Sequence, residues 1–153
     1  MLYQANIEDY GSIIAFYDDV IERTADVREY ARWQKGKHPK AEGIKAYVQE
    51  GSMYLHKELD TLVGVMAVIH ILAVSPDRQG SGIGSEMVRE AIELAKANGM
   101  IAIRLDALAT NTPAHKLYER LGFEYRGKQN LYADITGWTD FYFFEYKYET
   151  RDY

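Results

Sequence analysis

Three glycines at alternate positions, Gly80, Gly82 and Gly84, stand directly before a long helical pattern in "RQGSGIGSEMVREAIELAKANG". Glycine lets backbone N–H groups approach a ligand without a Cβ atom in the way. The first turn of a helix leaves its N–H groups unpaired, and the helix dipole favours negative charge there. The stretch therefore predicts a binding site for a phosphate or pyrophosphate group.

A glycine-rich loop alone leaves several interpretations open, including a flexible loop without a ligand. A P-loop would end in Gly-Lys-Ser/Thr, which "GIGSEM" lacks. The sequence matches a dinucleotide-binding fingerprint better than a P-loop, because Asp106 stands where that fingerprint has its acidic residue. However, "SPDRQ" separates the preceding strand from the glycines, and no second βαβ unit follows.

The elements that must position this loop follow from hydrophobic periodicity. Helices are expected over 8–24, from about Pro39 to Gly51, from Ile83 to a stop at Asn98–Gly99, and over 110–122. In the last of these, Thr112 is the expected N-cap and Pro113 the first helical residue. Strands are expected over 2–5, 52–58, 61–68, 69–74, 100–108, 123–133 and 140–148. The order β-α-α-β-β-β-α-β-α-β-β predicts one α+β or mixed α/β domain, residues 1–153, around one sheet.

The charge and the amino-acid composition of the chain exclude several classes of function. The net charge is −5, the pI is about 5.4, and no basic run occurs, which argues against nucleic acid or an anionic membrane as a partner. The chain has no cysteine, which excludes disulfides and thiol chemistry. "MLYQANIEDY" does not resemble a signal peptide, so a cytoplasmic location is expected.

Two motifs resemble one enzyme family. The residues from Gln79 to Gly84 are similar to the Arg/Gln-x-x-Gly-x-Gly/Ala signature of the GNAT N-acetyltransferases, and they follow "HILAVSP", which looks like that family's fourth strand. "NTPAHKLYERLGFEYRG" resembles the family's second signature, Asn-x-x-Ala-x-x-Leu-Tyr-x-x-x-Gly-Phe. The resemblance is strong from Ile69 to Gly127. It implies a mixed, mostly antiparallel sheet flanked by about four helices.

The resemblance also implies a cofactor site. In the family the glycine loop binds the pyrophosphate of acetyl-CoA, the pantetheine arm lies along the fourth strand, and a backbone N–H near Val74 polarises the thioester carbonyl. Asn111 would face the cofactor, although turn chemistry before Pro113 explains it equally well. The residues carried over as cofactor-binding are Leu72, Ala73, Val74, Gln79, Gly80, Ser81, Gly82, Ile83, Gly84, Ser85, Asn111 and Ala114.

Tyr118 and His70 are the expected catalytic residues. By its motif position, Tyr118 would protonate the departing thiolate, whereas the structural alternative is packing beside Leu117. The family often places a Glu near the start of the fourth strand as the base, and none stands there. His70, expected on that strand on the same face as Leu72, is the candidate base. A structural histidine and a base at Asp106 are the alternatives.

The acceptor is expected to be a primary amine on a small molecule, a peptide N-terminus or a lysine. The site that binds the acceptor would be built by the first two helices and the last two strands. Its aromatic walls would be formed by Tyr30, Trp33, His38, Tyr132, Trp138 and Tyr142. No metal is expected, because His38, His56, His70 and His115 lack ligand spacing. A homodimer is left open.

These expectations define an N-acetyltransferase acting by direct attack in a ternary complex. The alternatives are a GNAT-like domain that binds acyl-CoA without catalysis and a dinucleotide-binding module. One stretch, "TLVGVMAVIHILAVS", is too long for a single strand and offers no turn formers at 67–69. It suggests that residues are missing from the given sequence between about Met66 and His70, and that they form a loop beside the acceptor site.

Overall fold

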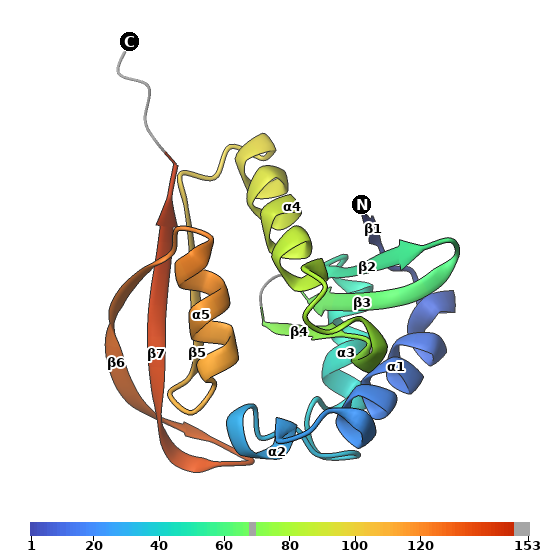
Figure 1. Cartoon of the computed structure of the whole chain (residues 1–153), viewed down its shortest axis with the longest axis horizontal. Helices are drawn as coiled ribbons and strands as arrows, with labels where there is room; N and C mark the ends of the chain where they lie inside the picture. The colour runs from blue at the N-terminus through green and yellow to red at the C-terminus, as the bar shows by residue number, and fades with distance from the viewer. Residues whose placement is uncertain (68–69, 149–153) are drawn as a thin grey trace.

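The computed structural model describes residues 1–67 and 70–148. Its strands form two antiparallel sheets, which Figure 1 shows on opposite sides of the molecule. The first sheet has the order β1-β2-β3-β4, with β1 Leu2–Gln4, β2 Met53–Glu58, β3 Thr61–Ala67 and β4 Ile71–Val74. The second has the order β5-β7-β6, with β5 Ala102–Leu108, β6 Glu124–Ala133 and β7 Gly137–Lys147.

Five α-helices accompany these strands in the described part of the chain: α1 Tyr10–Arg23, α2 Val27–Tyr30, α3 Ala41–Gln49, α4 Ile83–Ala97 and α5 Thr112–Arg120. Two 3₁₀ turns, Ile7–Asp9 and Pro76–Arg78, precede α1 and α4. The predicted α+β class is confirmed. Two details differ from the expectation: the short helix α2 is additional, and the strands form two sheets instead of one. Among the described residues β4 and β5 do not pair with each other.

Each sheet has its own apolar core. The amphipathic face of α1, which includes Ile13 and Tyr17, packs with α3 against one face of the first sheet. The face of α4 that carries Met87 and Val88 packs with α5 and the second sheet. The strand β3 is buried on both faces, because Val65 belongs to the first core and Met66 to the second.

Gly64 of β3 lies directly under the side chain of Met87 of α4. A Cβ atom at this position would lie 2.5 Å from Met87 Sδ, so a larger residue requires the end of the Met87 side chain to move. The glycine in "LVGVM" therefore leaves room for Met87 between α4 and the sheet.

The segment 61–75 folds back on itself. The strand β4 pairs antiparallel with β3, with Gly64 opposite Val74 and Ala67 opposite Ile71. The expectation that this stretch is not a single continuous strand is confirmed. The suggested missing loop falls at residues 68–69, which lie outside the described residues.

The start of α5 differs from the sequence-based expectation by one residue. The N-cap is Asn111, whose Oδ1 accepts a hydrogen bond from the Ala114 N–H at 3.3 Å. Thr112 is already the first helical residue, and Pro113 is the second. Both Asn and Thr are good N-caps, so residue type alone did not decide between them.

Among the residues described, none of the helices combines the length and apolar composition needed to span a membrane. The helices are amphipathic instead, each with one face in a core.

The buried carboxylate of Glu145 on β7 ties the strands of the second sheet together. Its oxygens lie 2.8 Å from Arg104 Nε on β5, 2.9 Å from Arg126 Nη2 on β6 and 3.3 Å from Lys147 Nζ. The hydrogen bond from Arg104 is the largest reason that the pKa of Glu145 falls to about 2.

We expect Glu145→Gln to weaken the fold in a pH-dependent way. The pKa of this carboxyl is lower in the folded state than its ordinary value of 4.5, so its contribution is present above that value and is lost as the pH falls toward about 2. Urea unfolding between about pH 6 and pH 3 should show a wild-type advantage that shrinks with acidity. Glu124→Gln, which removes an exposed partner of Arg126, is the matched control. A pH-independent difference would contradict the assignment.

Candidate active site

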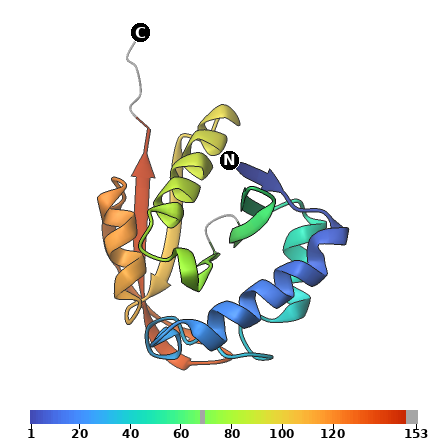
Figure 2. The ribbon, with the colours of Figure 1, turned by 45° about the vertical axis from the view of Figure 1, so that its right-hand side comes forward.

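A pocket of about 1010 Å³ opens between the two sheets and is lined by β4, the loop before α4, β5 and α5. Helix α2 and the segment after it, together with the β6–β7 turn, line its other side. Figure 2 shows α2 and the β6–β7 turn next to each other at the bottom of the molecule. A volume of this size exceeds that of a typical drug-sized site and is sufficient for an extended ligand. The pocket joins the two sequence motifs that are separate along the chain.

The glycine loop lies in this pocket and leads directly into α4. Gly82 is the N-cap of α4 with φ of +92°, and Gly80 has φ of +77°, conformations that residues with a Cβ rarely adopt. No side chain caps α4, so the N–H groups of its first turn remain available to a ligand in the pocket. Gln79, Gly80, Gly82, Ile83, Gly84 and Ser85 all line it, as expected.

Ser81 differs from this expectation. It does not line the pocket, its N–H donates to the Arg78 carbonyl at 3.3 Å, and its hydroxyl donates to the same oxygen. Ser81 therefore closes the turn and does not offer a donor to the ligand. The sequence motif could not show this, because turn hydrogen bonds depend on the local backbone conformation.

The strand β4 presents an unpaired edge to the pocket. The Ser75 N–H donates to the Val63 carbonyl at 2.9 Å, so the alternate backbone groups of Leu72 and Val74 face away from β3. The Val74 carbonyl on this edge accepts a hydrogen bond from Gln79 Nε2 at 3.1 Å. An extended ligand with its own amide groups can pair with this edge as an added strand.

Tyr118 on α5 is 7% exposed and lines the pocket. Its ring packs against Phe123 and Phe144, with centroids 5.7 and 5.8 Å away. Burial, and then the charge of Asp106 on β5, raise the pKa of Tyr118 to about 12. The phenol therefore keeps its proton at neutral pH and is available as a hydrogen-bond donor.

His70 also lines the pocket, but it lies in the turn before β4 and not on the strand. It is exposed, and its ring stacks on Tyr47 of α3 with centroids 5.9 Å apart. This position removes the alternative of a histidine buried in the sheet. Asp106, the other candidate base, lines the pocket from β5.

Asn111 and Ala114 line the pocket at the start of α5. The side-chain oxygen of Asn111 caps the helix, as described above, which supports the turn interpretation. Because the residue also lines the pocket, its amide nitrogen remains available for a ligand.

The aromatic residues expected at the acceptor end divide into two groups. Tyr30, Trp33 and His38 line the pocket, and burial followed by the charge of Lys40 lowers the pKa of His38. The other three lie outside it: Tyr132 packs on Trp138 at 5.9 Å between ring centroids, and Tyr142 stacks on His115 at 4.9 Å. The final strands contribute the turn Ala133–Thr136 and Phe141 instead.

Sequence reasoning missed the arginines beside the glycine loop. Arg120 on α5 donates to Ser85 Oγ at 2.8 Å, and Arg78 and Arg89 also line the pocket. Arg89 follows Ser85 by one helical turn, a spacing that places both on one face of α4 and could have indicated it. Arg120 reaches Ser85 only through the tertiary fold. These cations suit a ligand that carries several phosphates.

Sequence reasoning also missed the acidic surroundings of His56. This residue lies outside the pocket on β2, where the fold brings it close to Glu86 and Glu90 of α4. The grouping joins residues about thirty positions apart in the chain, so a search for neighbouring ligands could not detect it.

Comparisons with known proteins identify the family of this chain. A family model described as the acetyltransferase (GNAT) family matches residues 6–123. The chain is 42% identical over 59 residues to an uncharacterised N-acetyltransferase of Methanocaldococcus jannaschii, covering 39% of this chain and 26% of that protein. It is 40% identical over 67 residues to the mycothiol acetyltransferase of Pseudarthrobacter chlorophenolicus, covering 44% of this chain and 21% of that protein. The chain thus spans only about a quarter or less of the length of these two relatives.

A putative acetyltransferase of Salmonella typhimurium, solved with its cofactor acetyl-CoA, has the same fold with a TM-score of 0.71. It is 17% identical, and the match covers 100% of this chain and 96% of that one. The family model extends over the glycine loop, α4 and α5, and over most residues of both cores. This chain belongs to the GNAT acetyltransferase family.

Proposed function

We propose that this domain transfers an acetyl group from acetyl-CoA to a primary amine by direct attack in a ternary complex. The observation that carries the proposal is the meeting of three features in one pocket: the open edge of β4, the uncapped N-terminus of α4 and the buried phenol of Tyr118.

The pocket suits the parts of acetyl-CoA in order along its length. The amides of the first turn of α4, with Arg120 and Arg89 nearby, would hold the pyrophosphate. The backbone groups of Leu72 and Val74 would pair with the amides of the pantetheine arm. The Val74 N–H would polarise the thioester carbonyl and so favour the charge that develops on its oxygen.

The acid and base roles divide between the two sides of the pocket. Tyr118 would donate a hydrogen bond to the departing sulfur. Because the pKa of Tyr118, about 12, lies above that of an ordinary thiol, stabilisation of the thiolate is favoured over complete proton transfer. His70 is the proposed base that removes the proton from the ammonium group of the acceptor, with Asp106 as the alternative.

A thiol-release assay tests the proposal directly. Each turnover frees one CoA thiol, and the protein has no cysteine, so a thiol reagent reports only the product. Acetyl-CoA is incubated with polyamines, amino acids, aminoglycosides and peptides that carry free N-termini or lysines. We expect amine-dependent release with at least one class and a matching acetylated product by mass spectrometry.

The same assay separates the alternatives. Tight acetyl-CoA binding with no transfer to any amine would indicate a non-catalytic acyl-CoA domain. A thermal-shift comparison of acetyl-CoA with NAD addresses the dinucleotide interpretation, since stabilisation by NAD alone would contradict the proposed function.

A further inference from the structure

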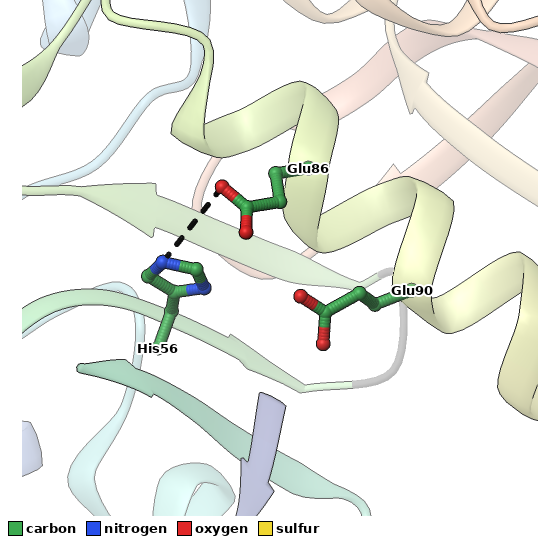
Figure 3. Close-up of side chains that lie close together, drawn as sticks. All are labelled: His56, Glu86 and Glu90. Atoms are coloured by element: carbon green, nitrogen blue, oxygen red, sulfur yellow. Dashed lines mark ion pairs between the residues drawn. The ribbon is translucent and has the colours of Figure 1, made fainter. Parts of the chain in front are cut away.

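A second cluster of reactive side chains lies outside the pocket, on a neighbouring face of α4. His56 of β2 faces Glu86 and Glu90 of α4, and Figure 3 shows the three side chains converging. One ligand atom from each residue lies within 4.8 Å of the other two. None of the three lines the acetyl-CoA pocket.

The fold builds this cluster from two rigid elements. Glu86 and Glu90 are separated by one helical turn, so their carboxylates share one face of α4. His56 stands on β2 opposite Gly64 of β3, the glycine that lies under Met87 of α4. The cluster is closed at its base and open at its top, because His56 is 3% exposed whereas the side chains of Glu86 and Glu90 are 52% and 30% exposed.

The imidazole of His56 is incompletely satisfied. Its Nδ1 is buried and has no hydrogen-bond partner among the described residues. Its Nε2 lies 4.0 Å from Glu86 Oε2, which is too far for a hydrogen bond. In Figure 3 one ring nitrogen is joined to Glu86 by the dashed line, and the other ring nitrogen lies on the side of Glu90. A buried imidazole nitrogen without a partner is costly, and this one points to a ligand at the cluster.

The two carboxylates already attract positive charge. The Met1 amino nitrogen lies 3.1 Å from Glu90 Oε1 and 3.9 Å from Glu86 Oε1. The Leu2 N–H donates to the second oxygen, Glu90 Oε2. A cation that binds more strongly than this amino group could replace it without disturbing the Leu2 contact.

We propose that His56, Glu86 and Glu90 bind a divalent transition-metal ion, with Zn²⁺ as the best match. Imidazole nitrogen and carboxylate oxygen are both ligand types that Zn²⁺ takes, whereas Mg²⁺ prefers oxygen ligands alone. Zinc takes these ligands at about 2.0–2.2 Å, so the donor atoms must approach by about 1 Å, which rotation of the accessible glutamates permits. Water would complete the coordination.

Such an ion would hold two elements of the fold together next to the cofactor site. It would join β2 to the first two turns of α4, whose N-terminus faces the acetyl-CoA pocket. Binding would therefore stabilise the folded state, and this effect does not depend on whether the domain has transferase activity.

The test uses tag-free, metal-stripped protein in a buffer that does not bind metals. Titration calorimetry with ZnCl2 should show one equivalent bound at micromolar or tighter Kd. A Zn²⁺ concentration about 100-fold above Kd should raise the Tm by about 5–10 °C, whereas MgCl2 at the same concentration should not. Glu86→Gln changes an exposed side chain and should weaken zinc binding at least 10-fold.

Two further variants show whether the zinc binds at this cluster. Glu93→Gln, on the same helix but outside the cluster, should bind zinc like the wild type. His56→Asn should also lose binding, provided that circular dichroism shows the variant to be folded. The proposal is overturned if the wild type binds no zinc, which would leave the carboxylates as partners of the Met1 amino group, or if Glu86→Gln binds it unchanged.

Discussion

Replacing Tyr118 with phenylalanine is expected to lower kcat by about 10²–10³-fold, the usual cost of removing a hydrogen-bond donor that stabilises developing negative charge. The Kd for acetyl-CoA should change little, because phenylalanine fills the same space between Phe123 and Phe144. The hydroxyl makes no hydrogen bond to another described residue, so its removal leaves no partner unsatisfied. The loss should therefore fall on the chemical step.

Rapid-quench measurement of a single turnover checks this expectation, because it separates acetyl transfer from product release. Tyr146→Phe is the matched control, since its ring also packs on Phe123 but does not line the pocket. An unchanged transfer rate in Tyr118→Phe would remove the acid role and leave Tyr118 as a packing residue.

Replacing Gly84 with valine is expected to weaken acetyl-CoA binding strongly with the helix intact. A Cβ atom there would lie 3.7 Å from Leu72 and Val74 and 3.9 Å from Leu117, an ordinary contact. Alanine should therefore be accepted, whereas the branched side chain of valine would fill the space between β4 and α5. We expect Gly84→Val to raise the Kd by about 100-fold or more, which corresponds to about 2.7 kcal/mol.

The same substitution at Gly82 would act through a different cause. Its φ of +92° strains any residue with a Cβ, so Gly82→Val should lose binding and also lower the Tm. Gly11→Val, at an exposed helical position with open space around it, controls for the change in helix propensity. Calorimetry with acetyl-CoA distinguishes the variants. If Gly84→Val binds acetyl-CoA as tightly as the wild type, the cofactor does not lie between β4 and α5.

The sequence predicted the elements whose signals are local. The helix α4 combines a regular apolar face with a glycine start, and both properties can be read without knowledge of the partner strands. The same holds for α5, except that two neighbouring polar residues, Asn111 and Thr112, were both suitable caps. The choice between them depends on the path by which the chain leaves β5.

Features that depend on contacts between distant segments were not predictable. The separation of β4 from β5 divides one expected sheet into two, and no residue in either strand signals that the pairing is broken. His70 was assigned to a strand that begins one residue later, which changes it from a sheet residue to a turn residue. The reach of Arg120 to Ser85 and the approach of His56 to Glu86 likewise follow from packing across the core.

The unpaired edge of β4 also bears on how the protein avoids aggregation. An open strand edge is a template for pairing with another protein chain, and most proteins block such edges with charges, prolines or bulges. The sequence "ILAV" of β4 carries none of these charges or prolines. The edge is instead recessed, because Gly84 and Leu117 line the pocket alongside it. A narrow, extended ligand can reach these backbone groups, while the edge of a neighbouring sheet would bring the side chains on both of its faces against α4 and α5.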